Sequence, residues 1–247
     1  MIDYRVVDGI SHLTLNRPDK LNALSESFWT ELPVVLAESE ADGDVKALVL
    51  SGNGRSFCAG ADISSFSTRS TSESRNQFIA TINAAMQSFE HYTKPTIAAV
   101  HGHVLGGGCE LTMMADIVIA DETASFGLPE IRSGIMPGPG LVRGLSHLSL
   151  HTLKYLCMTG EPISVHHAQR FGLVNELVQP GQHRDRAVAL ARSMSEYSPV
   201  ALAELKKFVA NQVRSDYDYV TSSLSFLFGT DRAQNAAKQF ISQGAKK

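Results

Sequence analysis

The chain has 247 residues, of which 43 % are hydrophobic and 19 % are charged. This is the composition of a globular protein, and it is too apolar for a disordered one. Lys and Arg number 22 against 25 Asp and Glu, so the formal net charge is −3 at pH 7. Because general nucleic-acid binding needs a basic surface, this balance argues against a nucleic-acid-binding protein.

The cysteines and the hydrophobic runs favour a cytoplasmic protein with neither disulfides nor a metal centre. Cys58, Cys109 and Cys157 are far apart and odd in number, so they form neither a disulfide framework nor a zinc-binding spacing. No apolar run reaches the length of a membrane span, and the first nine residues lack the apolar core of a signal peptide. We therefore expect a soluble protein in a reducing compartment, with no membrane partner.

The first 180 residues predict a layered α/β core. Asp8-Gly9 lies between two apolar segments and is typical of a two-residue β-hairpin turn. Short, continuous apolar runs predict buried strands over Ala47–Leu50, Thr96–Val100 and Ile117–Ala120. Helical periodicity is found between these runs, over residues 25–42 and 72–91.

The hydrophobic pattern of the sequence changes after Pro180-Gly181. The remaining residues contain no strand-like run, and amphipathic stretches predict helices over residues 184–197, 199–213, 217–228 and 231–242. We therefore divide the chain into a core, residues 1–181, and a helical region, residues 182–247. Helices with short apolar faces often pack against another element, so this region is expected to form a subunit interface.

Several common catalytic motifs are missing from the sequence. There is no phosphate-binding loop of the G-x-x-x-x-G-K-[ST] type, no G-x-S-x-G elbow and no H-E-x-x-H zinc motif. The glycines of residues 138–144 come nearest to a dinucleotide fingerprint, but their spacing is wrong and no strand directly precedes them. A nucleotide-dependent dehydrogenase is therefore disfavoured.

Two glycine-rich segments could bring backbone N–H groups close to a ligand. In residues 56–63 the small residues Ala59, Gly60 and Ala61 follow a predicted strand, although a turn without a ligand would have the same composition. Gly106, Gly107 and Gly108 precede or open a helix, where unpaired N–H donors and the positive end of the helix dipole suit an anion or a developing oxyanion.

Glu110 and Glu130 are the candidate acid and base. Glu110 falls in the first turn of the predicted helix among apolar neighbours, where it could also simply complement the helix dipole. Glu130 follows Pro129, which favours a loop position, and it lies 20 residues after Glu110. If a helix, a strand and a return loop bring the two together in an apolar pocket, their pKa values would be pushed apart.

His101 and His103 alternate around Gly102 and could be metal ligands. The sequence offers no clear third ligand, so ordinary hydrogen-bonded histidines are the favoured interpretation.

Taken in order, several segments resemble the crotonase (enoyl-CoA hydratase/isomerase) family, and the resemblance covers nearly the whole chain. These segments are Asn16-Arg-Pro-Asp-Lys-Leu-Asn-Ala-Leu24, Phe57-Cys-Ala-Gly-Ala-Asp-Ile63, Gly106-Gly-Gly-Cys-Glu-Leu111, Ala115-Asp-Ile117, Phe126-Gly-Leu-Pro-Glu130, Pro137-Gly138, Phe171-Gly-Leu-Val174 and Phe228-Gly-Thr-Asp-Arg232. The resemblance implies an α/β fold, a spiral of ββα units followed by a helical trimerisation region, and a homotrimer or dimer of trimers.

The resemblance also implies the roles of individual residues. An acyl-CoA thioester would place its carbonyl oxygen between the N–H groups of Ala61 and Gly107, and Gly138 would lie beside the catalytic water. Glu110 and Glu130 match the two glutamates of the hydratase subgroup. The CoA moiety would be held by Lys20, Leu21, Ala61, Asp62 and Ile63. The resemblance calls for no metal and no cofactor, because CoA is part of the substrate.

Hydration of a 2-enoyl-CoA is accordingly the predicted activity. A Δ3,Δ2-enoyl-CoA isomerase, or another dehydratase or lyase of the family, would use the same oxyanion hole. The chain departs from the family pattern after Pro137-Gly138, where it has Gly140-Leu-Val-Arg-Gly-Leu145. This departure puts the start of the local helix and the acyl pocket in question, and so leaves the identity of the substrate open.

Overall fold

A β-hairpin at the beginning of the chain starts the larger of two sheets. In the computed structural model, which describes residues 1–66, 69–138, 140–211 and 217–244, β1 (Ile2–Val7) and β2 (Ile10–Leu15) pair antiparallel. Asp8 and Gly9 between them both have positive φ, 51° and 73°, as a type I′ turn requires. The predicted hairpin is confirmed.

Four further strands extend this sheet by parallel pairing from β2 onwards. They are β3 (Ala47–Gly52), β4 (Thr96–Val100), β6 (Ile117–Asp121) and β9 (Glu176–Val178), and the sheet order is β1-β2-β3-β4-β6-β9. β3 and β4 are buried at every residue, as expected for parallel strands covered on both faces. The three predicted buried strands are confirmed as β3, β4 and β6.

A small second sheet consists of β5 (His103–Leu105), β7 (Ser125–Gly127) and β8 (Ile163–Ser164). β4 leads into β5 and then into a helix, and β6 leads into β7 and then into a short 3-10 helix, so that successive units contribute one strand to each sheet. Strands of two or three residues are too short to show a hydrophobic period, which is why the sequence did not predict them.

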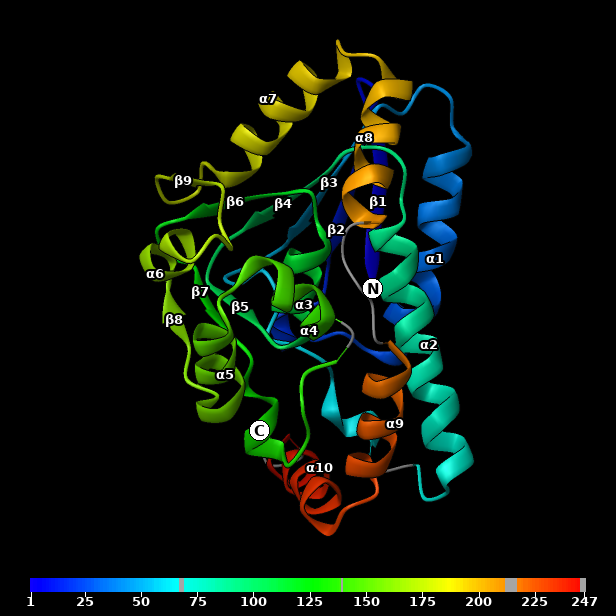
Figure 1. Ribbon diagram of the computed structural model, residues 1–247, viewed down its shortest axis with the longest axis vertical. Coiled ribbons are helices and arrows are strands. Elements are labelled where there is room, and N and C mark those ends of the chain that lie inside the picture. The colour runs from blue at the N-terminus through cyan, green and yellow to red at the C-terminus, as the bar shows by residue number, and fades with distance from the viewer. Residues whose placement is uncertain (67–68, 139, 212–216, 245–247) are drawn as a thin grey trace.

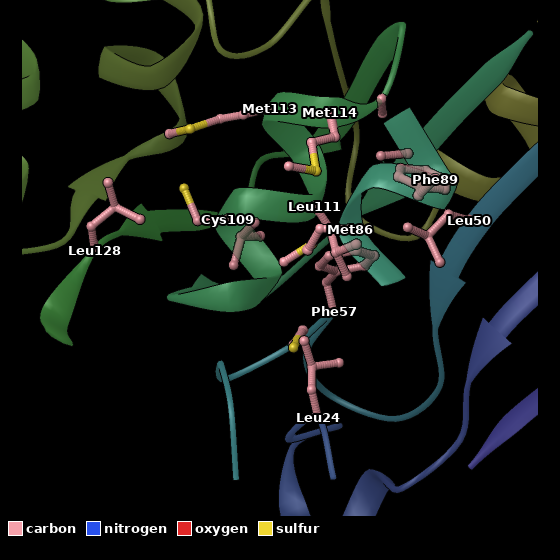
Figure 2. Packing of buried hydrophobic residues seen from close by; sticks show 14 of the residues in the cluster. Leu24, Leu50, Phe57, Met86, Phe89, Cys109, Leu111, Met113, Met114 and Leu128 are labelled. Carbon is pink, nitrogen blue, oxygen red and sulfur yellow. The ribbon is translucent and has the colours of Figure 1, made fainter. Parts of the chain in front are cut away.

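Two long helices cover the main core, and a third, short helix lies inside it. α1 (Glu26–Ala41) and α2 (Ser72–Glu90) lie side by side along one flank of the molecule (Figure 1). α3 (Gly107–Met114) is buried at all eight residues, including the polar Glu110 and Thr112. Figure 2 shows Met86 and Phe89 of α2 and Leu50 of β3 gathered around Leu111 of α3.

The remaining helices of the first part of the chain are short. They comprise α4 (Gly140–His147), α5 (Leu150–Thr159) and α6 (Val165–Arg170), together with the 3-10 helices η1 (Pro18–Lys20), η2 (Ile63–Phe66) and η3 (Pro129–Ser133).

The end of the chain is helical, as predicted, and its helices pack in different places. α7 (His183–Ser195) crosses the larger sheet, where the small residues Ala187 and Ala191 are buried with Ile97 and Ile119. α8 (Pro199–Asn211) follows α7, and the end of the predicted helix 199–213 lies outside the described residues. α9 (Tyr217–Phe228) packs on α2, and α10 (Asp231–Gly244) packs on η2 and η3 (Figure 1).

α7 therefore covers one face of the sheet, a contact that the sequence did not indicate. The division of the chain at residue 181 stays a prediction. Throughout the described residues, no helix is both long and apolar enough to cross a membrane.

A buried cluster of polar side chains joins α7 to the ends of β4 and β6. The rings of His101 and His183 stack with their centroids 4.6 Å apart, and His183 Nδ1 lies 3.1 Å from Asp121 Oδ2. His101 Nε2 is 2.8 Å from the Gly54 carbonyl oxygen. In the part of the chain that the structure describes, no group of three His, Cys, Asp or Glu side chains is placed to hold a metal ion.

The pKa of His183 is lowered to about 4, first by burial and then by His101, and the attraction of Asp121 opposes this shift only in part. Unfolded His binds a proton near pH 6.5, whereas native His183 stays neutral to lower pH. Stability is therefore lost as the pH falls from about 6.5 toward 4. In urea unfolding between pH 7.5 and 5, the His183→Gln variant should lose less stability than the wild type, and parallel losses would contradict this assignment.

Candidate active site

The loop that carries Lys20 and Leu21 is fixed by the buried side chain of Asn22. The Asn22 amide donates from Nδ2 to the carbonyl oxygens of Asn53, at 2.7 Å, and Ser56, at 2.8 Å. Its Oδ1 accepts the Arg17 N–H at 2.8 Å. Leu21 and Asn22 both have positive φ, 50° and 57°, an unusual conformation for residues with side chains. Sequence reasoning did not single out Asn22, because nothing local distinguishes it from a turn residue.

The same loop pairs with the segment around Ala61. Leu24 N–H donates to the Gly60 carbonyl, and Asp62 N–H donates to the Leu24 carbonyl, both at 2.9 Å. In such a parallel bridge the residue between the two bonded groups turns its own N–H away from the partner strand, so the N–H of Ala61 faces away from Leu24.

The residues predicted to hold CoA are thereby brought together. Leu21 accepts the Ala59 N–H at 2.9 Å, Lys20 is exposed, and Ile63 opens η2. Asp62 forms an ion pair with Arg17 at 3.2 Å. Burial would raise the pKa of Asp62, but hydrogen bonds from Ser64 and Arg17 outweigh it and hold the pKa below its usual value. Asp62 is therefore a carboxylate at neutral pH.

β5 holds Gly107 beside Ala61. Cys58 N–H donates to the His103 carbonyl and Leu105 N–H donates to the Cys58 carbonyl, both at 2.9 Å, so the loop before Ala61 runs along β5. A Cβ atom on Gly107 would lie only 3.8 Å from the Ala61 nitrogen. Among the hydrogen bonds of the described residues, none is donated by the N–H of Ala61 or of Gly107. Two unpaired donors thus lie side by side, as an oxyanion hole requires.

Glu110 comes from the first turn of α3 and is only 5 % exposed. The backbone around Gly138 lies against its carboxylate, since a Cβ atom on Gly138 would be 3.2 Å from Oε1. Burial raises the pKa of Glu110, and the charge of Glu130 raises it further. Hydrogen bonding from the N–H groups of Gly138, Gly140 and Leu141 at the start of α4 favours the carboxylate but does not cancel the increase.

Glu130 lies on η3, whose first residue is Pro129, rather than on an irregular loop. Its Oε1 is 2.9 Å from the position that a Cβ atom of Gly106 would take. Gly106 has φ 52° and directly precedes Gly107, so the carboxylate lies at the beginning of α3. Burial raises the pKa of Glu130. The two glutamates are therefore brought to one place, as the sequence suggested without being able to establish it.

Each carboxylate has an oxygen available to a ligand. Glu110 Oε1 and Glu130 Oε2 are buried and have no hydrogen-bond partner among the described residues. A buried polar atom without a partner is costly, so it is expected to meet a substrate or a water molecule. Two carboxyl groups with raised pKa values beside two free N–H donors can move protons at a carbonyl compound whose oxygen gains negative charge.

Known proteins share the sequence pattern and the fold of this chain. The sequence profile described as enoyl-CoA hydratase/isomerase matches residues 5–239. The chain belongs to this family. It is 38 % identical over 238 residues to a short-chain-enoyl-CoA hydratase of Clostridium acetobutylicum, covering 94 % of this chain and 91 % of the relative. It is 37 % identical over 196 residues to a 2,3-dehydroadipyl-CoA hydratase of Escherichia coli, covering 79 % and 76 %.

Solved structures give the same result for the α/β fold. An enoyl-CoA hydratase/isomerase from Mycobacterium paratuberculosis superposes with a TM-score of 0.89 at 27 % identity, covering 96 % of this chain and 97 % of that one. One from Xanthobacter autotrophicus Py2 gives 0.88 at 27 % identity, covering 100 % and 93 %. The family resemblance predicted from the sequence is confirmed.

The stretch that departs from the family pattern nevertheless begins a helix, since α4 starts at Gly140. Sequence reasoning also missed how tightly Gly140 packs. A Cβ atom there would overlap Cβ of Glu110, so only glycine allows α4 to start against the carboxylate.

Gly140→Ala should therefore displace Glu110 or α4. We expect the catalytic rate to fall at least tenfold and the protein to lose about 1–3 kcal/mol of stability, as for other overpacked sites. Gly144→Ala is the matched control, because its Cβ would meet the movable end of Leu153 at 3.0 Å. Steady-state kinetics and urea unfolding measure both effects, and a fully active Gly140→Ala variant would contradict the assigned packing.

Proposed function

We propose that the chain is an enoyl-CoA hydratase, which adds water across the 2,3 double bond of a 2-enoyl-CoA thioester to give a 3-hydroxyacyl-CoA. The observation that carries the proposal is the placement of Glu110 and Glu130 beside the unpaired N–H groups of Ala61 and Gly107. The relatives that are named hydratases support it, and with it the prediction made from the sequence.

The thioester oxygen is bound by the N–H groups of Ala61 and Gly107. Addition at Cβ of a 2-enoyl thioester passes through an enolate-like state with negative charge on this oxygen. Donors already in place meet that charge without reorganisation, and each contributes roughly 3–4 kcal/mol of transition-state stabilisation by analogy with other oxyanion holes. Gly107 opens α3, so the positive end of the helix dipole acts in the same direction.

Water is placed between the two carboxyl groups, next to the backbone of Gly138. Glu110 takes a proton from water while the hydroxyl group bonds to Cβ, although burial and the charge of Glu130 raise its pKa as burial raises that of Glu130. Glu130, whose pKa is raised by burial, delivers a proton to Cα. The sum is one water added and no change of redox equivalents, so this chemistry calls for no metal or redox cofactor.

The CoA moiety is held by Lys20, Leu21 and the backbone of Ala61–Ile63. Two features support this assignment. Hydrogen bonds of Asn22 hold the loop of residues 17–22, and a parallel bridge joins Leu24 to Ala61. Lys20 is exposed and cationic, which suits the anionic phosphates of CoA. We assign the protein to fatty acid metabolism in the cytoplasm, as the proposed reaction and the cysteine content favour.

The finer architecture and the assembly belong to the same proposal: a spiral of ββα units and a homotrimer or dimer of trimers formed by the C-terminal helices. Exposed apolar side chains on α8 support it, namely Val200, Leu205, Phe208 and Val209. Such a surface is expected to be covered by another subunit.

The two carboxyl groups act as one unit in this scheme. Glu110→Gln and Glu130→Gln should each lower kcat for hydration of crotonyl-CoA by about 10²–10⁴-fold, with binding of the thioester kept, because Gln preserves size and hydrogen bonding. The double variant should be little worse than the poorer single one. Loss of the enoyl absorbance measures the reaction.

An isomerase needs only one of these groups to move a proton between Cα and Cγ. Normal hydration by either single variant would therefore overturn the hydratase proposal. Double-bond migration faster than hydration in the wild type would do the same.

The assembly is tested by light scattering at micromolar concentration, where a mass of three or six chains is expected. Phe208→Glu on the exposed face of α8 should shift the mass toward the monomer, and Val34→Glu, an exposed residue of α1, is the control. A wild-type monomer under these conditions would overturn the proposed assembly.

A further inference from the structure

The CoA loop, residues 17–22, rests on a second loop of residues 52–56, which we call the support loop. Asn22 of the CoA loop donates hydrogen bonds to two carbonyl oxygens of the support loop. A Cβ atom on Gly54 would lie only 2.7 Å from Cβ of Pro18, so the two loops are also in direct contact there. A shift of the support loop would therefore displace the CoA loop.

Arg184 of α7 binds the support loop through its guanidinium group. Its Nη2 atom donates to the carbonyl oxygen of Gly52 and, at 2.9 Å, to Oδ1 of Asn53. The carbonyl oxygen of the same Asn53 accepts the Asn22 amide at 2.7 Å. A continuous chain of hydrogen bonds thus runs from α7 through Asn53 to the CoA loop.

The residue before Arg184 supports the same loop through a second side chain. The rings of His183 and His101 stack with their centroids 4.6 Å apart, and His101 Nε2 lies 2.8 Å from the Gly54 carbonyl oxygen. Two consecutive residues at the start of α7 therefore reach the support loop by separate routes. Since α7 is itself packed on the larger sheet, it gives the loop a fixed attachment.

The other two arginines of α7 have different partners. Arg186 pairs with Glu176 at 2.6 Å and Arg192 pairs with Asp8 at 2.8 Å, and all four side chains are exposed. Among the ion pairs of the described residues, none involves Arg184. Its charged group is therefore bound to oxygens of the support loop, and hydrogen bonds from a charged donor are stronger than those between neutral groups.

We propose that Arg184 is a positioning residue for CoA binding: by holding the support loop, it keeps the CoA loop in the conformation that brings Lys20 to the phosphates of CoA. This inference rests on the proposed function, in which the CoA loop contacts the substrate. Arg184 acts through Asn53 and Asn22 and not on the reacting atoms. Its effect should therefore depend on the nucleotide part of the thioester.

Arg184→Met removes the charged donor and keeps the aliphatic stem. Crotonyl-CoA is compared with crotonyl-N-acetylcysteamine, which has the same acyl thioester but lacks the nucleotide. The ratio of kcat/KM for the first to that for the second should fall by about fivefold or more, because two hydrogen bonds from a charged group are lost. Arg184→Lys should restore part of the ratio, since an ammonium group can donate to the same oxygens. Arg192→Met, on the same helix, is the matched control and should leave the ratio unchanged.

Three results would overturn the positioning role. They are an unchanged ratio in folded Arg184→Met, an equal fall in Arg192→Met, and a loss by the same factor with both thioesters, which indicates general damage to the structure. Circular dichroism checks the fold. If Arg184→Met does not fold, Asn53→Ala removes an acceptor at the other end of the hydrogen bond and should lower the same ratio, and an unchanged ratio would count against the proposal.

Calorimetric binding of CoA itself requires no turnover and so separates this inference from the proposed reaction. The Kd for CoA should rise by about fivefold or more in Arg184→Met. A wild type that binds CoA more tightly than the variant but does not hydrate crotonyl-CoA would refute the hydratase function alone. A wild type that hydrates crotonyl-CoA, with equal affinity for CoA in Arg184→Met, would refute the positioning role alone.

Discussion

The burial of one carboxyl group constrains the whole centre of the molecule. Glu110 is nearly inaccessible on a helix that has no exposed residue, and a polar group in such a place needs partners. Those partners are backbone N–H groups at the beginning of another helix, α4. They can approach only because residues 138 and 140 are glycines. The burial of α3 leaves Glu110 without solvent, and the glycines of this turn let backbone N–H groups come close to its carboxyl group. Each of these two features therefore depends on the other.

The proposed oxyanion hole depends on pairing between segments that are distant in the sequence. Single parallel bridges join Leu24 to Ala61 and Cys58 to Val104. They fix the orientation of the Ala61 N–H and hold it beside Gly107. No side chain has to supply the donors, so the geometry of the hole depends on backbone rather than on rotamers. This suits a function in which donors must be in place before charge develops.

The hairpin, the buried strands and most helices could be predicted from the sequence, because turn residues and hydrophobic period are local signals. The family and the identity of Glu110 and Glu130 followed from motifs. The short strands β5, β7 and β8 carry no period, and the packing of α7 on the sheet rests on the two alanines Ala187 and Ala191, which look unremarkable in sequence. The role of Asn22 and the contact of Gly140 with Glu110 arise only when distant segments meet.

The hydrogen bonds of Asn22 also bear on the thermodynamics of ligand binding. The amide fastens the loop of Leu21 to Asn53 and Ser56 in a left-handed backbone conformation by hydrogen bonds within the chain. If a loop became ordered only when the substrate binds, its loss of conformational entropy would lower the affinity for the substrate. In this protein the loop loses its conformational entropy during folding. Binding of a large and flexible thioester therefore has to offset the conformational entropy of the thioester but not that of this loop.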